Sequence, residues 1–164
     1  MRLTAVFTPP AGFARIGIAT TGERLCGLRW LDDAEEPRVG QDVVPAFTAT
    51  VLDQLAAYFT DAHWRFSLPL QLEGSLFQQR VWQALADIPV GTTCSYSALA
   101  QCLRTSARAI GGACRRNPIP IILPCHRVVA IAGPGGYCGR TSGEPLAIKR
   151  RLLAHEGADQ DLLL

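Results

Sequence analysis

Residues 123–133 read LPCHRVVAIAG and place a thiol, an imidazole and a guanidinium side by side in an apolar stretch. A cysteine in such a stretch is usually a small buried hydrophobe, and a neighbouring histidine is more often structural than catalytic. The pair could also be a nucleophile with its base, because a thiol needs a base or a positive neighbour to react as the thiolate. For Cys125 and His126 alone, both interpretations stay open.

The apolar runs on either side of this pair, 121–123 and 128–131, favour short strands. In a strand, successive side chains point to opposite faces, so His126 would not touch the Cys125 sulfur directly. A bridging water or a local turn would connect the two groups.

Composition limits the kind of protein. The chain has 164 residues, of which 48% are hydrophobic and 18% charged, as in a folded domain. No apolar run reaches the roughly 18 residues needed to cross a bilayer, and the start of the chain lacks a signal-peptide pattern. The six cysteines form no CxxC pair and match no common zinc spacing. We therefore expect a cytoplasmic protein with reduced thiols, no metal and no membrane partner.

Charge is distributed unevenly along the chain. Residues 1–74 carry six arginines and nine acidic residues, whereas residues 75–156 carry nine arginines, one lysine and three acidic residues. A basic second half indicates either a contact with a polyanion or a solvated surface.

Residues 1–73 predict a small unit of strands and one helix. The alternation over 14–19 and over 25–31, joined by a turn, favours a β-hairpin. A polar loop follows over 32–40, and residues 46–59 carry apolar side chains at helical spacing. Pro69 and Gly74 mark the boundary to a second domain, 74–164.

The second domain is expected to be mostly helical. Residues 75–89 place apolar side chains on one helical face. Ser95 favours the start of a short helix, and Thr105 or Ser106 favours the start of another, which ends before Asn117. Two short helices joined by a tight turn are typical of the helix-turn-helix motif.

The second of these helices has an almost smooth surface. Its small residues include Ala109 and Gly112, although each glycine costs a helix about 1 kcal/mol relative to alanine. Small residues that lower helix stability indicate the close approach of another backbone. Arg108 projects among them, and Arg115 and Arg116 lie at the C-terminal end of the helix. Such a helix suits a nucleic-acid groove. The alternative is tight packing within the core, with Arg108 simply solvated.

Four segments, in order, resemble the O6-alkylguanine-DNA alkyltransferases, also called methylated-DNA–protein-cysteine methyltransferases. They are FQQRVWQALADIPVG, SYSALA, ARAIGGACRRNPIPIILPCHRVV and LLAHEG. The resemblance is specific over about residues 74–157, whereas the first half matches only in size and outline. It implies an α/β (α+β) fold: an N-terminal α/β supporting domain over 1–73, and a DNA-binding and alkyl-acceptor domain over 74–164 with a helix-turn-helix and a short active-site strand.

The resemblance also implies roles for the matching residues. Cys125 falls on the alkyl-accepting cysteine, His126 on the histidine that takes the thiol proton through a water, and Glu156 on the glutamate that orients this histidine. Asn117 falls on the asparagine that joins the recognition helix to the active-site strand. Tyr96 falls on the tyrosine that helps to rotate the target nucleotide.

The implied DNA contacts come from the smooth helix, which would enter the minor groove. Arg108 falls on the arginine that fills the gap left by the flipped nucleotide. Arg115 and Arg116 are candidates for phosphate contacts. Ala109 and Gly112 are candidates for close contact with the DNA backbone. Arg127 is either a further phosphate contact or a structural ion-pair partner.

The chain departs from the family pattern in three places. Between Tyr96 and Arg108 it is about two residues shorter and lacks the usual Gly and Pro, which leaves the turn geometry open. The loop before Tyr137 is about one residue shorter. Tyr137 and Cys138 are implied to line the pocket, and residues 138–149 are several residues longer than the usual glycine-rich link. We expect this insertion to lie beside the pocket and to affect which alkyl groups fit.

The implied function is repair of double-stranded DNA that carries O6-alkylguanine, with activity on O4-alkylthymine left open. The Cys125 thiolate would take the alkyl group after base flipping, in one irreversible turnover, by a monomer without a cofactor. Three alternatives remain. A non-catalytic lesion-binding relative would lack the acceptor cysteine, a helix-turn-helix transcription factor would need neither Cys125 nor Glu156, and a Cys-His-Glu hydrolase would turn over.

Overall fold

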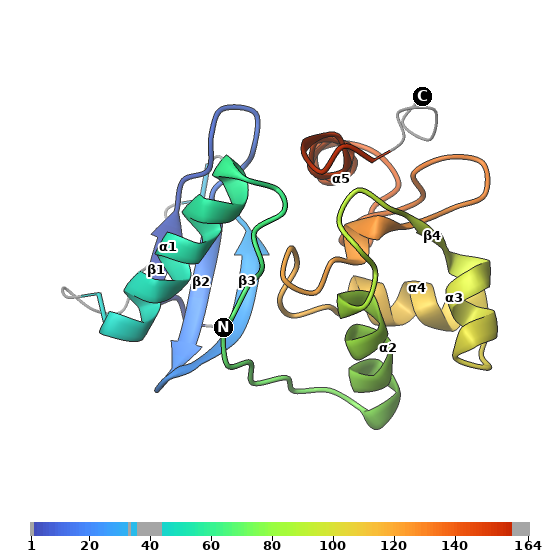
Figure 1. The fold of residues 1–164 in the computed structure, drawn as a ribbon, viewed down its shortest axis with the longest axis horizontal. Coiled ribbons are helices and arrows are strands. Elements are labelled where there is room, and N and C mark those ends of the chain that lie inside the picture. Colours follow the sequence, from blue (N-terminus) through green and yellow to red (C-terminus); the bar gives the residue numbers. More distant parts are fainter. Residues whose placement is uncertain (1, 33, 36–43, 159–164) are drawn as a thin grey trace. The chain divides into compact units, whose positions relative to one another are not determined.

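The computed structural model describes residues 2–32, 34–35 and 44–158, and the chain divides into two compact units, Met1–Glu73 and Gly74–Leu164 (Figure 1). Strands and helices are mixed in an α+β arrangement, which confirms the expected fold class. Within the described residues, no helix is long and apolar enough to cross a membrane.

The first unit is a three-stranded antiparallel sheet with one helix. The strands β1 (Ala5–Phe7), β2 (Ile16–Thr21) and β3 (Arg24–Trp30) lie in the order β1-β2-β3, and α1 (Ala46–Thr60) packs on the sheet. The hairpin and the helix are confirmed. Strand β1 was not predicted, because three residues are too few to show alternation. The polar loop expected over 32–40 lies largely outside the described residues.

The second unit is mostly helical, as predicted. Its elements are α2 (Leu76–Ala86), β4 (Cys94–Ser95), α3 (Tyr96–Cys102), α4 (Ala107–Arg115), the 3₁₀ turn η1 (Cys125–Arg127), β5 (Val128–Val129) and α5 (Glu144–His155). A capping box begins α2, in which Ser75 and Gln78 exchange hydrogen bonds between side chain and backbone. The buried Trp82 donates its indole N–H to the Ala113 carbonyl at 2.9 Å, which fastens α2 to α4.

The turn between α3 and α4 forms without the usual Gly and Pro. The Thr105 N–H bonds to the Ala100 carbonyl (2.9 Å) and the Arg104 N–H to the Gln101 carbonyl (3.1 Å), which is the hydrogen-bond pattern of a Schellman motif. Arg104 adopts the left-handed conformation, with φ of 51°, that glycine normally takes there. Ser95 caps α3 and Ser106 caps α4, so the predicted helix starts are confirmed.

The apolar run before Pro124 is not a strand, contrary to expectation. Residues 118–123 form turns, and Ile121 has φ of 77°. Prolines at 118, 120 and 124 supply no N–H for a sheet ladder, so this segment cannot pair as a strand. After η1, only Val128–Val129 is extended, and it pairs in parallel with β4.

The expectation of a long link over 138–149 is wrong in its second half, because α5 already begins at Glu144. Gly143, with φ of 76°, turns the chain, and Pro145 and Glu144 occupy the first helical turn, where both residue types are favourable. The additional residues after Tyr137 therefore divide between a short link, 138–143, and the start of a helix.

Candidate active site

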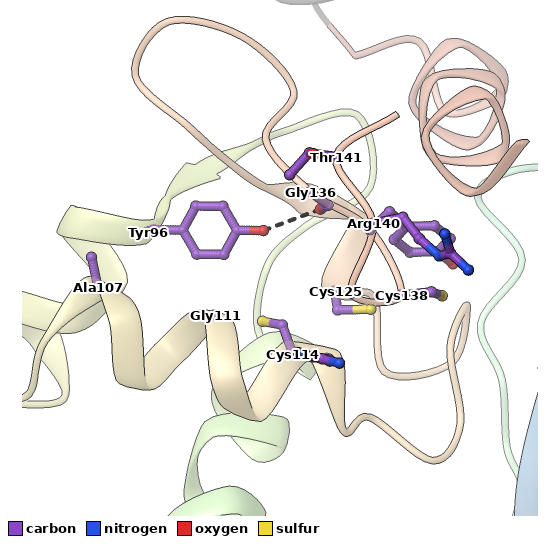
Figure 2. Close-up of a pocket in the computed structure, with 12 residues that line it drawn as sticks. Tyr96, Ala107, Gly111, Cys114, Cys125, Gly136, Cys138, Arg140 and Thr141 are labelled. Carbon is purple, nitrogen blue, oxygen red and sulfur yellow. Dashed lines mark hydrogen bonds between the residues drawn. The ribbon is translucent and has the colours of Figure 1, made fainter. Parts of the chain in front are cut away.

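The thiol of Cys125 lies at the base of a cavity in the second unit. Cys125 begins η1 and is 4% exposed. The cavity has a volume of about 400 Å³ and is lined by residues of α3, α4, η1 and the chain segment 136–141 (Figure 2). Burial raises the pKa of the Cys125 thiol, whereas a hydrogen bond with Asn117 and the positive charge of Lys149 lower it. Burial dominates, so the resting group is the neutral thiol and needs a base.

Glu156 connects His126 and Arg127 in a fully buried cluster behind this thiol. The Glu156 Oε1 atom lies 2.9 Å from His126 Nε2 and accepts from Arg127 Nη2 at 2.9 Å, while Oε2 accepts from Arg127 Nε at 2.8 Å. Burial alone raises the pKa of the Glu156 carboxyl, but the hydrogen bonds from His126 and Arg127 outweigh it and hold the pKa well below its usual value. Glu156 is therefore a permanent carboxylate.

The cluster decides which nitrogen of His126 carries the proton. A carboxylate only accepts hydrogen bonds, so Nε2 carries the proton and donates a hydrogen bond to Glu156. Burial lowers the pKa of His126 despite the neighbouring carboxylate, which keeps the ring neutral. The buried Nδ1 is then a free acceptor, and it has no hydrogen-bond partner within the described residues. His126 is thus in the tautomer that can take a proton at Nδ1.

Arg127 is a structural partner, and the alternative of a phosphate contact is wrong. Its side chain is buried and bonds Glu156, and its Nη1 donates to the Ile88 carbonyl at 2.5 Å, at the end of α2. None of its charge is directed to a surface that DNA could reach.

Asn117 does more than end α4. Its Nδ2 donates to the Leu123 carbonyl at 2.6 Å and its Oδ1 accepts from the Ile119 N–H at 3.0 Å, which closes the proline-rich turn. The interaction with Asn117 also lowers the pKa of the Cys125 thiol. Asn117 therefore joins the end of α4 to the turn that precedes Cys125.

Tyr96 and Tyr137 both line the cavity, a place that the resemblance implied for Tyr137. The Tyr96 hydroxyl donates to the Gly136 carbonyl at 3.3 Å (Figure 2). Burial raises the pKa of Tyr96 far above its ordinary value, so the phenol keeps its proton. Tyr137 is buried and begins a tight turn in the wall of the cavity.

Cys138 occupies the first central position of that turn. The Tyr137 N–H bonds to the Arg140 carbonyl (2.8 Å) and the Arg140 N–H to the Tyr137 carbonyl (2.9 Å). Cys138 and Gly139 have φ of 47° and 78°, which is the type I′ pattern that usually takes Asn-Gly. A Cβ on Gly139 would lie 2.7 Å from Arg115 Nε, so Arg115 packs against this turn. Its position at the cavity was not expected from the sequence.

The outer surface of α4 is open. Arg108, Arg115 and Arg116 are exposed, and Ala109 is half-buried. A Cβ added at Gly112 would meet no atom within 4 Å. The alternative of tight packing in the core is therefore wrong for this face, because Ile110, Ala113 and Cys114 form the buried side instead.

Lys149 is the site residue that sequence reasoning missed. It lies on α5, is 0% exposed and donates to the carbonyls of Val128 (2.6 Å) and Gly136 (3.0 Å). Its ammonium also lies 5.7 Å from the centre of the Tyr96 ring. One signal was available: the chain has fifteen arginines and this single lysine.

Known proteins are similar to this chain in sequence. Residues 76–158 match the family model described as 6-O-methylguanine DNA methyltransferase, DNA binding domain. A methylated-DNA–protein-cysteine methyltransferase of Mycolicibacterium paratuberculosis is 41% identical over 145 residues, which cover 83% of this chain and 88% of that protein. Its counterpart from Mycobacterium leprae is 44% identical over 119 residues, covering 71% of this chain and 72% of that protein.

Solved structures show the same similarity. A variant of the Mycobacterium tuberculosis O6-methylguanine methyltransferase has a TM-score of 0.75 at 37% identity, and 96% of each chain is covered. The Mycobacterium tuberculosis OGT in complex with DNA has a TM-score of 0.73 at 37% identity and the same coverage. Since the matched family model spans the half of the chain that holds the buried thiol, and full-length relatives align over most of their length, the chain belongs to the methylated-DNA–protein-cysteine methyltransferase family.

Proposed function

We propose that this protein repairs O6-alkylguanine in double-stranded DNA by moving the alkyl group to its own Cys125, once per molecule. The observation that carries the proposal is the buried Cys125 thiol at the base of a cavity whose rim belongs to the open helix α4. The cavity volume of about 400 Å³ lies within the range of small-molecule sites.

The proton of the thiol has a defined acceptor. Because His126 is neutral and protonated at Nε2, its Nδ1 takes the Cys125 proton through a bridging water. Glu156 stabilises the imidazolium that forms, as the acid does in other catalytic triads. The buried Arg127 fixes the Glu156 carboxylate and so fixes the imidazole orientation.

The transfer is a single displacement. The Cys125 sulfur forms a bond to the alkyl carbon, the bond from that carbon to guanine O6 breaks, and the electron pair of this bond leaves with guanine. Tyr96, which keeps its phenolic proton, donates a hydrogen bond to the departing guanine. The proton that His126 took from the thiol is available to neutralise the guanine anion. The product thioether is not readily hydrolysed, so the protein acts once. The transfer balances without a cofactor.

The DNA approaches the open face of α4. Flipping a nucleotide costs a few kcal/mol, and a side chain inserted in the gap offsets part of this cost. Arg108 is the exposed long side chain among the small residues of this face and takes that role. Arg115 and Arg116 are exposed and supply phosphate contacts in this proposal. Free thiols at all six cysteines fit a reducing compartment, which supports action in the cytoplasm.

Three thiols border the cavity, and this allows a matched test. Labelled alkyl uptake from duplex DNA is measured for Cys125→Ala, Cys114→Ala and Cys138→Ala. We expect Cys125→Ala to lose uptake and to retain lesion binding, while the other two variants still take up one alkyl group. Continued uptake by Cys125→Ala would overturn the assignment of the acceptor.

A further inference from the structure

Two guanidinium groups belong to the wall of the cavity that holds the acceptor thiol. Arg115 and Arg140 both line this cavity together with Cys125. Among the described residues, no acidic side chain lines it, and no carboxylate forms an ion pair with either arginine. The cavity wall beside the thiol is therefore positively charged.

The tight turn after Tyr137 directs the Arg140 side chain toward the cavity. Tyr137 and Arg140 lie opposite each other in an antiparallel bridge, and their backbones exchange hydrogen bonds of 2.8 and 2.9 Å. Residues directly opposite in such a pair have their side chains on the same face. Since Tyr137 is buried in the cavity wall, Arg140 is held on the cavity side of the turn (Figure 2).

Arg115 reaches the same turn from the end of α4. A Cβ at Gly139 would lie 2.7 Å from Arg115 Nε and 3.1 Å from Arg115 Cδ, so the arginine packs where only glycine leaves room. The two arginines thus lie at one turn, although they come from α4 and from the link 138–143. Guanidinium groups bind carboxylates through pairs of parallel hydrogen bonds, so this turn suits an anionic ligand.

The transfer reaction needs such a positive wall when the alkyl group is itself an anion. Cys125 reacts as a thiolate, so an alkyl group that ends in a carboxylate brings a second negative charge close to the sulfur. Like charges repel more strongly where bound DNA covers the cavity and excludes water. An arginine in the wall offsets this repulsion and binds the carboxylate through charge-assisted hydrogen bonds.

We propose that Arg140, together with Arg115, makes the cavity selective for O6-alkyl groups that carry a carboxylate, of which carboxymethyl is the smallest. The Cys125 sulfur forms a bond to the methylene carbon, the bond from that carbon to guanine O6 breaks, and its electron pair leaves with guanine. The carboxylate is unchanged, and the product is S-carboxymethylcysteine. The inference rests on the proposed function of Cys125 as the acceptor and names a substrate class for it.

The test uses three duplexes that differ only in the O6 group of one guanine, which is methyl, carboxymethyl or carbamoylmethyl. Carbamoylmethyl has nearly the size of carboxymethyl but no charge, so the ratio of the carboxymethyl rate to the carbamoylmethyl rate measures charge recognition. Single-turnover rates are measured with excess protein, from the mass of the Cys125 peptide. We expect Arg140→Gln to lower this ratio about tenfold, because a charge-assisted hydrogen bond is lost. Arg140→Lys, which keeps the charge, should stay within about threefold of the wild-type ratio.

Arg150→Gln is the matched control, because Arg150 is exposed on α5 and is not among the residues that line this cavity. Its ratio should equal that of the wild type. An unchanged ratio in Arg140→Gln would overturn the proposal, and equal slowing of all three lesions would identify a DNA phosphate as the partner of Arg140 instead. Methyl transfer by the wild-type protein separates the two hypotheses. If the wild type accepts no group from any duplex, the proposed repair function fails, whereas methyl transfer with an unchanged ratio refutes the carboxylate preference alone.

Discussion

Replacing Glu156 by glutamine removes the charge at the centre of the buried cluster. The two carboxylate oxygens accept from His126 Nε2, Arg127 Nε and Arg127 Nη2. In glutamine, an NH₂ group replaces one carboxylate oxygen and faces the donors that this oxygen accepted from. The negative charge is also lost, so the buried Arg127 charge has no ionic partner. Removal of one partner from a buried ion pair costs about 3–5 kcal/mol. For a chain of this size, we expect the melting temperature to fall by about 6–20 °C.

A matched control lies at the other end of the same helix. Glu144 begins α5 and pairs with Arg151 at 2.8 Å, with both side chains about half exposed. Glu144→Gln should cost less than about 1 kcal/mol, because exposed pairs contribute little. Both variants are measured by thermal and urea unfolding at pH 7. Equal losses, or a loss below about 1 kcal/mol for Glu156→Gln, would refute the account of the cluster.

The same pair of proteins gives a pH dependence with a defined sign. Burial raises the pKa of Glu156, but hydrogen bonds from His126 and Arg127 hold it below the ordinary value of 4.5. A depressed carboxyl pKa stabilises the fold above the unfolded pKa, and this contribution is lost as the pH falls below it. We therefore expect the stability difference between wild type and Glu156→Gln to be constant near neutral pH and to narrow below about pH 4.5. A difference that widens on acidification would contradict this sign.

Other predictions concern the DNA-binding face and the two strained turns. Arg108→Ala should slow transfer from duplex DNA about tenfold and leave the reaction with free O6-benzylguanine almost unchanged, because only the duplex requires flipping; equal slowing of both, measured by single-turnover kinetics, would count against insertion. Gly112→Ala should stabilise the fold by up to about 1 kcal/mol in urea titrations, since its Cβ meets no atom, yet weaken DNA binding in titrations with labelled duplex. Arg104→Gly and Cys138→Asn should each raise stability by about 1 kcal/mol in the same urea titrations, because both positions have positive φ; a loss at either would show that the native side chain contributes more than its backbone conformation costs.

The sequence predicted those elements that depend on neighbouring residues of the chain, such as the starts of helices. Ser95 was predicted as one helix cap and either Thr105 or Ser106 as the other; Ser95 and Ser106 accept the N-terminal hydrogen bonds. The side-by-side placement of His126 and Glu156, thirty residues apart, followed from the family resemblance and not from spacing, and the structure brings the two within 2.9 Å.

The misses came from tertiary effects. The apolar run 121–123 favoured a strand, but the prolines at 118, 120 and 124 supply no N–H for a sheet, and Asn117 supports a turn instead. Lys149 was counted as part of a basic surface, because nothing in its neighbourhood on the chain shows that α5 buries it against η1. Arg127 stayed undecided for the same reason, until Glu156 was found beside it.

The mass of the intact protein after mixing with duplex DNA that carries one O6-methylguanine tests the central claim most directly. The account predicts a gain of one methyl group in place of a hydrogen, capped at one per protein and located on Cys125 by peptide mapping. Tight binding to the lesion without any gain in mass, or a gain located on Cys114 or Cys138, would contradict it.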